Sequence, residues 1–408
     1  MLLADVYEAF ILDLDGVLFR GDEPIAAATP TIDALRGMGK RLVFLTNNSA
    51  RTPEQIATKL GRLGIDASAD EVVTSAQATG EFLAGQRESG QPLTAYVIGQ
   101  DGIRSALVES GLELVDGDAD RSDFVVVGWD GDVTYEMLRR ATVLVRGGAR
   151  LVATNADASY PAPGGELWPG AGAILAAVET ASDARAVVVG KPHPPLFRSA
   201  LSRAGTRKAL MVGDRIETDI AGAVTAGLDA ALVLSGAGRA RDLLDQRALP
   251  VAILRDVGGL LSAEARHLPR PASSEELDSV RALTEAPEDA PPWGPDGVWV
   301  IGDEHVDATA TVVGRDGHAY LRAVATRTEL RGGGLGTLAI AAALGSARES
   351  GVGQAWLLTE AAEPFFRKLG FERVDRAEMP SWIEAGPADG CPATAVAMRR
   401  ELAQTDQG

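Results

Sequence analysis

Two aspartates stand two residues apart directly after an apolar run near the start of the chain. The run AFIL leads into Asp13 and Asp15, and Gly16 follows them. Side chains two residues apart along a strand project to the same side. Two adjacent carboxylates repel each other, and a hard cation such as Mg²⁺ relieves that repulsion through oxygen ligands. Gly16 would let the backbone turn sharply and present N–H groups to an anion. Taken alone, such a pattern is more often a solvated acidic loop.

Three further sets of polar residues follow apolar runs in the same way. Thr46 and Asn47 end the run RLVFL and supply a hydroxyl and amides suited to phosphate oxygens. Lys191 ends the run AVVVG, and its ammonium group could neutralise a phosphoryl group and a carboxylate nucleophile together. Asp214 ends ALMVG, and Asp219 adds a further acid. Singly, Lys191 could be a solvated lysine and Asp214 a helix N-cap. Together, the four sets predict one phosphate-handling site.

The elements that must position these residues alternate through the first 260 residues. Short, nearly continuous apolar runs are typical of parallel strands that are buried on both faces and covered by helices. Helix patterns lie between them, such as Thr52–Leu63, with Thr52 as N-cap and Pro53 in the first position, and Gly222–Ala226. Because open parallel sheets bind ligands at the carboxyl ends of their strands, one or two doubly wound α/β units would bring the four sets to one edge. The expected strands are AFILD, RLVFLTN, AYVIG, DFVVVGW, RLVATN, AVVVGK, ALMVGD and AALVL.

These motifs resemble those of the haloacid dehalogenase (HAD) superfamily of phosphotransferases. Residues 13–18 (DLDGVL) match its first motif, Thr46 its second, Lys191 its third, and Asp214 with Asp219 its fourth. The chain is more narrowly similar to the NagD-like branch of that superfamily, through residues 45–49 (LTNNS), 190–192 (GKP) and 213–220 (GDRIETDI). The resemblance covers residues 1 to about 262 and implies a doubly wound parallel-sheet core.

The stretch between the second and third motifs is far longer than one crossover needs. The NagD-like branch inserts an α/β cap at this point, and residues 154–157 (TNAD) resemble its Thr-Asn-x-Asp cap segment. The resemblance therefore implies a HAD-like phosphatase core formed by residues 1–80 and 182–262. Residues 81–181 would form the inserted cap.

The resemblance also implies a two-step hydrolysis of a phosphate ester. Asp13 would attack phosphorus and form an aspartyl-phosphate. Asp15 would protonate the leaving oxygen and then take a proton from the water that hydrolyses the intermediate. One Mg²⁺ would be held by Asp13, the backbone carbonyl of Asp15, and Asp214. Asp219 would orient its loop rather than bind the metal.

Other groups are assigned to the substrate by the same resemblance. Four would bind the phosphate oxygens: Gly16, Thr46, the Asn47 amide and Lys191. Asn155 and Asp157 in the cap are candidates for polar contacts with the leaving group, and an Asx turn after a strand is the alternative for both. The substrate would be a small phosphorylated metabolite, with glycerol 3-phosphate as the first expectation and phosphoglycolate as the second.

A glycine run marks the second half of the chain. It joins the strand pattern HAYLRAVA to an alanine-rich helix pattern over Leu335–Glu349. Glycines at a helix N-terminus expose N–H groups that suit a pyrophosphate. With residues 365–371 (FFRKLGF) and with Arg270-Pro271-Ala272, the run resembles the GNAT (GCN5-related) acetyltransferases, whose pyrophosphate loop binds acetyl-CoA. The loop residues are Arg331, Gly332, Gly333, Gly334, Leu335 and Gly336.

The limits and the activity of this second half follow from the resemblance. We expect a linker over residues 263–272 and an α/β GNAT-like domain over residues 273–402. Many GNAT enzymes use a tyrosine as general acid where this chain has Phe366, which has no proton to donate. The domain could be an acetyltransferase, an acyl-CoA-binding domain that reports to the phosphatase, or a surface for homodimer contacts. A non-enzymatic acyl-CoA sensor on a HAD scaffold is the competing function, and the complete set of HAD motif residues argues against it.

Composition narrows the remaining possibilities. The chain has 408 residues and a formal net charge of −18, so neither nucleic acid nor an anionic membrane surface is an expected partner. Cys391 is the only cysteine, which excludes an intrachain disulfide and a cysteine-based zinc site. The N-terminus lacks a basic region, and no apolar stretch reaches 18 residues. We therefore expect a cytoplasmic protein.

Overall fold

The chain forms two compact units in a computed structural model that describes residues 2–86, 93–116, 118–161, 166–262, 268–285, 297–303, 305–384 and 392–402. The N-terminal unit comprises Ala4–Ala237 and Asp256–Leu261. The C-terminal unit comprises Met1–Leu3, Gly238–Arg255 and Ser262–Gly408. Cys391 and residues 263–267 of the expected linker lie outside the described residues. The domain limits expected from the sequence stay a prediction.

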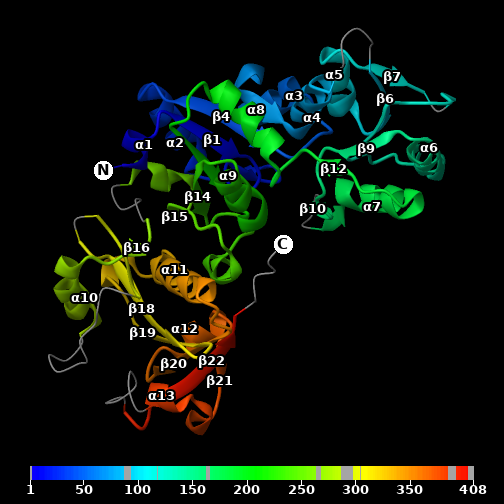
Figure 1. Cartoon of the computed structure of the whole chain (residues 1–408). Coiled ribbons are helices and arrows are strands. Elements are labelled where there is room, and N and C mark those ends of the chain that lie inside the picture. The colour runs from blue at the N-terminus through cyan, green and yellow to red at the C-terminus, as the bar shows by residue number, and fades with distance from the viewer. Residues whose placement is uncertain are drawn as a thin grey trace. The chain divides into compact units, whose positions relative to one another are not determined.

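A parallel sheet forms the core of the N-terminal unit. Within residues 4–237 its strand order is β14-β13-β1-β4-β5, and every neighbouring pair is parallel. Helices lie around this sheet (Figure 1), so the expected doubly wound arrangement is confirmed. The strands are β1 (Ala9–Asp13), β4 (Arg41–Thr46), β5 (Val72–Thr74), β13 (Ala209–Gly213) and β14 (Asp229–Val233). The helices are α1 (Leu3–Val6), α2 (Ala28–Gly37), α3 (Pro53–Arg62), α4 (Ser75–Ala84), α8 (Pro194–Ala204) and α9 (Ala221–Thr225).

Helix α3 shows how local sequence sets these boundaries. The Thr52 hydroxyl accepts a hydrogen bond from the Gln55 backbone N–H, and the Gln55 side chain accepts one from the Thr52 N–H. This capping box satisfies two N–H groups that a helix start leaves unpaired. Pro53 occupies the first position, and Gly64 takes a φ of 80° just after the end. The expected helix is confirmed to within a residue.

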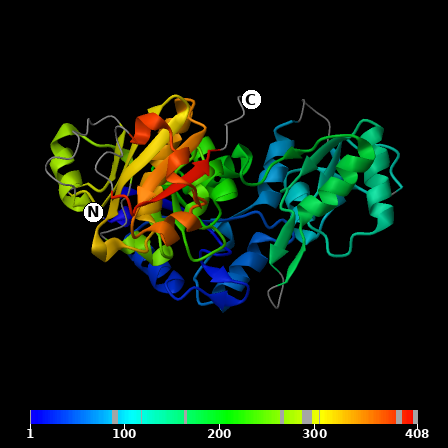
Figure 2. The ribbon, with the colours of Figure 1, turned by 90° about the horizontal axis from the view of Figure 1, so that it is seen from below.

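The inserted cap is a second parallel sheet, with the order β12-β9-β8-β6-β7. Both views of the ribbon place it beside the core sheet, with helices packed on it (Figures 1 and 2). Its interior is aliphatic and includes Ile98, Val127 and Val178, all fully buried. Its elements are β6 (Thr94–Ile98), α5 (Asp101–Glu109), β7 (Glu113–Val115), β8 (Phe124–Val127), α6 (Tyr135–Arg146), β9 (Arg150–Ala153), β10 (Ser159–Pro161), β11 (Leu167–Pro169), α7 (Ala171–Ser182) and β12 (Val187–Val188).

The prediction that the run AVVVG forms a strand of the core sheet is wrong. Of the run AVVVG, only Val187–Val188 form a strand, and β12 pairs with β9 at the edge of the cap sheet. The Gly190 N–H still donates to the Thr154 carbonyl before the chain leaves for α8. Val187 is 40% exposed, as an edge position allows. Lys191 therefore reaches the core from the cap side and does not follow a core strand.

The C-terminal unit contains a seven-stranded sheet with the order β16-β17-β18-β19-β20-β22-β21. β19 and β20 are its only parallel neighbours among the described residues, and they pair only where His318–Tyr320 face Gln354–Trp356. Beyond that point the two strands separate. The strands are β16 (Arg270–Pro271), β17 (Val298–Ile301), β18 (Ala308–Arg315), β19 (His318–Thr326), β20 (Gln354–Thr359), β21 (Glu372–Arg373) and β22 (Val396–Glu401). The helices are α10 (Leu277–Thr284), α11 (Leu335–Glu349), α12 (Glu363–Lys368) and α13 (Ser381–Glu384).

Helix α11 is buried on nearly all sides. It lies across the strands of its unit (Figure 1), and its other side packs against the short 3₁₀ helix η4 (Ala240–Asp245). A Cβ on Gly334, at the N-terminus of α11, would lie 3.2 Å from side-chain carbons of both Ala240 and Ile253. The segment Gly238–Arg255, which also contains β15 (Ala252–Leu254), therefore covers a helix that has no polar face of its own.

An ion pair joins Arg270 in β16 to Glu276, just before α10. The Arg270 guanidinium donates two hydrogen bonds to the Glu276 carboxylate, at 2.8 and 2.6 Å. These bonds lower the pKa of Glu276 to about 2.

We expect Arg270→Met to reduce the free energy of unfolding at pH 7 by about 1 kcal/mol, because the pair is partly exposed. A carboxyl group with a lowered pKa stabilises the folded state above its unfolded pKa, near 4.5. That contribution disappears as the pH falls through about 2. Urea unfolding of both proteins at pH 7 and pH 2.5 measures this, and an equal deficit at both pH values would contradict it.

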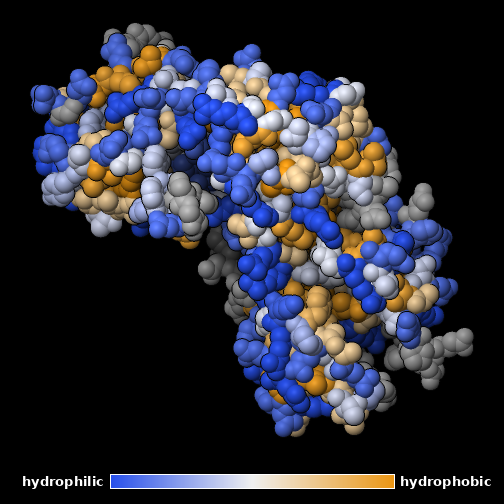
Figure 3. Space-filling view, turned by 180° about the vertical axis from the view of Figure 1, so that it is seen from behind, coloured by the Kyte–Doolittle hydropathy of each residue, from blue (hydrophilic) through white to orange (hydrophobic). Residues whose placement is uncertain are grey.

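The molecular surface is mostly hydrophilic on the face drawn in Figure 3, with small, separate hydrophobic patches. Within the described residues, no helix is both long and apolar enough to cross a membrane.

Candidate active site

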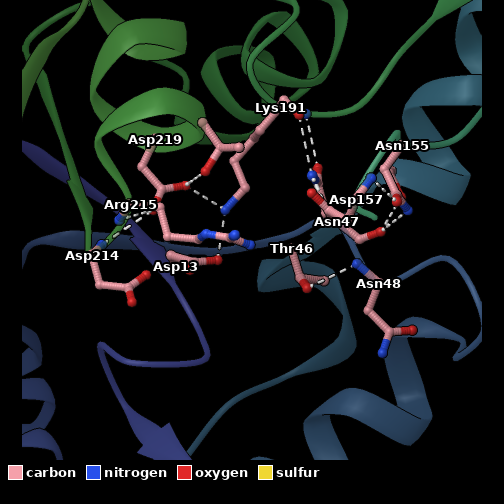
Figure 4. Close-up of polar contacts among 12 residues, drawn as sticks. Asp13, Thr46, Asn47, Asn48, Asn155, Asp157, Lys191, Asp214, Arg215 and Asp219 are labelled. Atoms are coloured by element: carbon pink, nitrogen blue, oxygen red, sulfur yellow. Dashed lines mark hydrogen bonds and ion pairs between the residues drawn. The ribbon is translucent and has the colours of Figure 1, made fainter. Parts of the chain in front are cut away.

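A buried ammonium group joins two aspartates of the N-terminal unit (Figure 4). Lys191 Nζ lies 2.7 Å from Asp13 Oδ1 and 2.7 Å from Asp219 Oδ1, and all three residues are buried. Burial opposes the charge of Lys191, but the carboxylates of Asp13 and Asp219 raise its pKa above the usual lysine value. The lysine therefore stays protonated.

Asp219 also holds the loop that follows β13. Its Oδ2 accepts hydrogen bonds from the backbone N–H groups of Asp214, at 3.1 Å, and Arg215, at 3.0 Å. With Oδ1 on Lys191 and Oδ2 on the loop, the carboxylate positions both. This geometry agrees with the orienting role expected for Asp219.

Asp214 lies in a space that two glycines keep open. The Ala237 N–H donates to Asp214 Oδ2 at 2.7 Å. A Cβ would stand 2.4 Å from that oxygen if built on Gly16 and 1.9 Å from it if built on Gly236. The Gly16 N–H donates to the Phe19 carbonyl, so the expectation that it faces a phosphate is corrected. Gly16 instead contributes a φ of 79° and room for a carboxylate.

Gly236 and Ala237 belong to this site, although no sequence motif pointed to them. They lie shortly after β14, which is the neighbour of β13 in the sheet. The signal that could have found them was a glycine close behind another apolar strand.

We expect Gly236→Ala to displace the Asp214 carboxylate and to lower kcat/KM by about 100-fold for the phosphate-ester hydrolysis that the resemblance implies, because a small misplacement of a ligand is costly in such sites. Gly61→Ala is the matched control, since a Cβ there meets nothing within 4 Å. Steady-state kinetics over a range of Mg²⁺ concentrations measure both variants. If Gly236→Ala behaved like the control, the close approach of Gly236 to Asp214 would have no functional weight.

The cluster has the chemistry of a divalent cation site. One carboxylate oxygen each from Asp13, Asp214 and Asp219 lie within 4.8 Å of one another. Burial, together with the neighbouring Asp219 and Asp214, raises the pKa of Asp13 well above its usual value, although Lys191 opposes this. Burial and Asp219 raise the pKa of Asp214 to about 6. Three carboxylates outweigh one ammonium group, and oxygen ligands with excess negative charge suit Mg²⁺.

Asp15 lies apart from this cluster, in the turn after β1. Its side chain keeps access to solvent, while the protein around it raises its pKa by desolvation, against the opposing charge of Lys59. A carboxyl group with a raised pKa is suited to donate a proton.

Asn47 holds Lys191 in place. Its side-chain Oδ1 accepts from the Lys191 backbone N–H at 2.8 Å, and its Nδ2 donates to the Lys191 carbonyl at 3.2 Å and to Asp157 Oδ2 at 3.1 Å. The side-chain amide is thus committed to positioning, and a phosphate contact by Asn47 would have to come from its backbone. The neighbouring Thr46 is buried, and its hydroxyl accepts from the Asn48 N–H at 3.1 Å.

Asn155 and Asp157 join the cap to the core. The Asn155 side chain donates to the Asn47 carbonyl at 2.8 Å, and its Oδ1 accepts from the Asp157 N–H at 3.1 Å. Because both ends of this buried amide are engaged, the expected substrate contact of Asn155 is corrected to the Asx-turn alternative. Asp157 is only partly buried and lies against Asn47, within the site.

The glycine loop of the C-terminal unit precedes α11, as expected. Gly332 and Gly334 take φ values of 86° and 85°, and Arg331 donates to the Thr326 carbonyl at 3.3 Å. The ring of Phe366 is buried and packs edge-on against Phe365 and Phe371. This ring belongs to the interior of the unit and supplies no acid or base.

Patterns of known protein families match both halves of the chain. The pattern of the haloacid dehalogenase-like hydrolases matches residues 10–113, and a second HAD-like hydrolase pattern matches residues 188–260. The pattern of the GNAT acetyltransferase family matches residues 265–371.

Individual relatives are phosphatases. The acid sugar phosphatase of Staphylococcus saprophyticus is 38% identical over 257 residues, which is 62% of this chain and 97% of that protein. Among solved structures, NagD from Escherichia coli K-12 is 30% identical with a TM-score of 0.57, over 62% of this chain and 98% of that one. The glycerol phosphate phosphatase of Mycobacterium tuberculosis, in complex with magnesium, is 29% identical with a TM-score of 0.66, over 85% of this chain and 93% of that one.

The sequence matches to complete phosphatases and the motif residues gathered around Lys191 agree with one another. The chain belongs to the haloacid dehalogenase-like phosphatases, with NagD among its relatives, and it carries a C-terminal domain of the GNAT acetyltransferase family.

Proposed function

We propose that the N-terminal unit is a Mg²⁺-dependent phosphomonoesterase that hydrolyses a small phosphorylated metabolite through an aspartyl-phosphate. The observation that carries this proposal is the contact of one buried lysine with Asp13 and Asp219, next to Asp214. Such a cluster presents a nucleophile beside a fixed positive charge.

Asp13 is the nucleophile in this mechanism. Its carboxylate oxygen bonds to phosphorus as the ester oxygen leaves. Lys191 already lies against Asp13 and would reduce the repulsion between the carboxylate and the incoming phosphate. When bound by Asp13 and Asp214, with the backbone carbonyl of Asp15 as a further ligand, Mg²⁺ would neutralise negative charge at the same place.

Asp15 would act as the acid and then as the base. Desolvation raises the pKa of Asp15, and a raised pKa suits a group that donates a proton to the leaving oxygen. The resulting carboxylate would take a proton from the water that attacks the aspartyl-phosphate. Thr46, the Asn47 backbone N–H and Lys191 would bind the phosphoryl oxygens.

Glycerol 3-phosphate is the first substrate we propose, followed by phosphoglycolate. Support comes from the M. tuberculosis glycerol phosphate phosphatase, because the similarity extends over 85% of this chain. The name of the S. saprophyticus relative makes sugar phosphates the next class to test. Asp157, partly exposed beside Asn47, is the cap residue we propose to contact the leaving group.

Phosphate release from a panel of these esters, with Mg²⁺ and with EDTA, tests the proposal. We expect turnover that EDTA abolishes and Mg²⁺ restores, with glycerol 3-phosphate giving the highest kcat/KM. Full turnover in EDTA would contradict the metal dependence. A higher kcat/KM for a sugar phosphate would replace the substrate and leave the chemistry intact.

We propose, as a second function, that the C-terminal unit binds acyl-CoA. It is supported by the separation of β19 from β20 and by the glycine loop at the start of α11. Acyl transfer is the less supported alternative, because Phe366 is buried where many GNAT enzymes hold a tyrosine.

A shift in melting temperature on adding acetyl-CoA tests this second function. Gly333 lacks a positive φ, and a Cβ on it meets only the Leu330 carbonyl, at 3.4 Å. Gly333→Glu should therefore abolish the shift by repelling the pyrophosphate, while Gly333→Ala should retain it. No shift in the unmodified protein at saturating acetyl-CoA would exclude this function.

A further inference from the structure

The C-terminal unit contains a cavity that neither proposed function uses. Its volume is about 810 Å³, within the range of small-molecule sites. It lies between the C-terminal half of α11, the segment 246–250 and the indole of Trp299 on β17. The glycine loop over residues 331–336 lies at the other end of α11 and does not line it.

One wall of the cavity is a buried arginine. Arg348, in the last turn of α11, is only 8% exposed. Its Nη2 donates to the Gln246 carbonyl at 3.2 Å, and this is its one hydrogen-bond acceptor in the part of the chain that the structure describes. A guanidinium carries five N–H donors, so this contact leaves most of the donor capacity of Arg348, which lines the cavity, unused. The nearby carboxylate of Asp245 is bound to Arg400 at 2.6 Å and offers Arg348 no direct ion pair.

The rest of the lining is mixed. Gln246, Arg247 and Glu349 are polar or charged, and the other residues are small or apolar. The helix contributes Ala341, Ala342, Gly345 and Ser346, whose side chains form a low floor along one face of α11. Opposite walls come from leucine and proline side chains and from Trp299. A flat apolar group would fit between the floor and these walls.

We propose that this cavity binds a small organic monoanion, a carboxylate attached to a flat apolar group, with the carboxylate on Arg348. A guanidinium accepts a carboxylate through two parallel hydrogen bonds. A monoanion matches the site better than a phosphate dianion, because Arg247 and Glu349 both line the cavity and offset each other, which leaves the single charge of Arg348.

Calorimetric titration of the full-length protein with 2-naphthoate tests the proposal. We expect a dissociation constant of about 1 mM or tighter, as for a ligand of this size. The neutral isostere 2-naphthamide should bind at least tenfold more weakly, because it lacks the charge, and acetate should bind at least tenfold more weakly, because it lacks the ring. Equal affinity for naphthoate and naphthamide would overturn the assignment, as would the absence of naphthoate binding.

Two variants locate the binding. Arg348→Met retains the aliphatic stem and should weaken naphthoate binding about 10- to 100-fold, in line with loss of a charged hydrogen-bond pair. Gly345→Leu keeps the arginine and fills the cavity, since a Cβ on Gly345 meets nothing closer than Arg348 Nη2 at 3.9 Å. It should abolish binding even if Arg348→Met fails to fold. Gly61→Leu in α3 is the control, and binding unchanged in Gly345→Leu would place the ligand elsewhere.

Discussion

Asp13→Asn should lower phosphatase kcat by at least about 1000-fold, because the amide cannot form the acyl-phosphate that divides the reaction into two easier steps. The substitution keeps an oxygen that can accept from Lys191 Nζ, which now lies 2.7 Å from Asp13 Oδ1. The loss should therefore be chemical and not structural. Single-turnover assays at saturating substrate and Mg²⁺ would measure it, and undiminished turnover would remove the proposed mechanism.

The same variant should be at least as stable as the unmodified protein in metal-free buffer. Burial raises the pKa of Asp13, which means that its ionised form is costly in the folded state at neutral pH. An amide removes that cost. A melting temperature at or above that of the unmodified protein, with activity lost, would separate a catalytic role from a structural one. A large fall in melting temperature would mean that the activity loss reports unfolding.

Lys191→Met should abolish activity and also destabilise the fold. It removes the ammonium group of Lys191 from a buried set of three carboxylates, and breaking a buried ion pair from one side costs about 3 kcal/mol or more. The cost should be largest at high pH and should shrink as the pH falls, because carboxylates with raised pKa values become neutral there. Chemical unfolding of the metal-free protein at pH 8 and pH 5 measures it.

A second substitution checks the physical cause. If repulsion among unpaired carboxylates drives the loss, Asp219→Asn should recover part of the stability when added to Lys191→Met. The double-variant cycle should then show coupling of about 1 kcal/mol or more between the two positions. Additive losses would mean that Lys191 acts through packing alone.

Much of the fold could be predicted from the sequence because the apolar runs and the caps are local signals. Helix α3 has its N-cap, its proline and its closing glycine within a dozen residues, and its limits follow from them. The prediction of a core strand over the run AVVVG was wrong because an apolar run is also only a local signal. An apolar run shows that a segment is buried or paired, but it does not show in which of two sheets the segment lies.

The site also has features that the sequence predicts and features that it does not. The motifs predicted that Asp13, Lys191 and Asp214 come together, because each of these residues lies at the end of a strand or in the loop that follows one. It could not predict which way an amide points. Asn155 turns onto the Asn47 carbonyl because it is buried there and an unpaired amide would be costly. The space that Gly236 leaves for Asp214 is equally a property of tertiary packing.

The path of residues 238–255 decides where this protein can be cut. The HAD-like sequence match runs to residue 260. In the structure, however, the segment Gly238–Arg255 belongs to the C-terminal unit and covers α11. A C-terminal fragment that begins at residue 263 would expose the alanine- and leucine-rich side of that helix to water and should be poorly soluble. A fragment that begins at residue 238 would retain its cover. The end of the HAD-like sequence match and the start of the segment that covers α11 therefore lie about twenty residues apart, and only a fragment cut at the second position keeps that helix away from water.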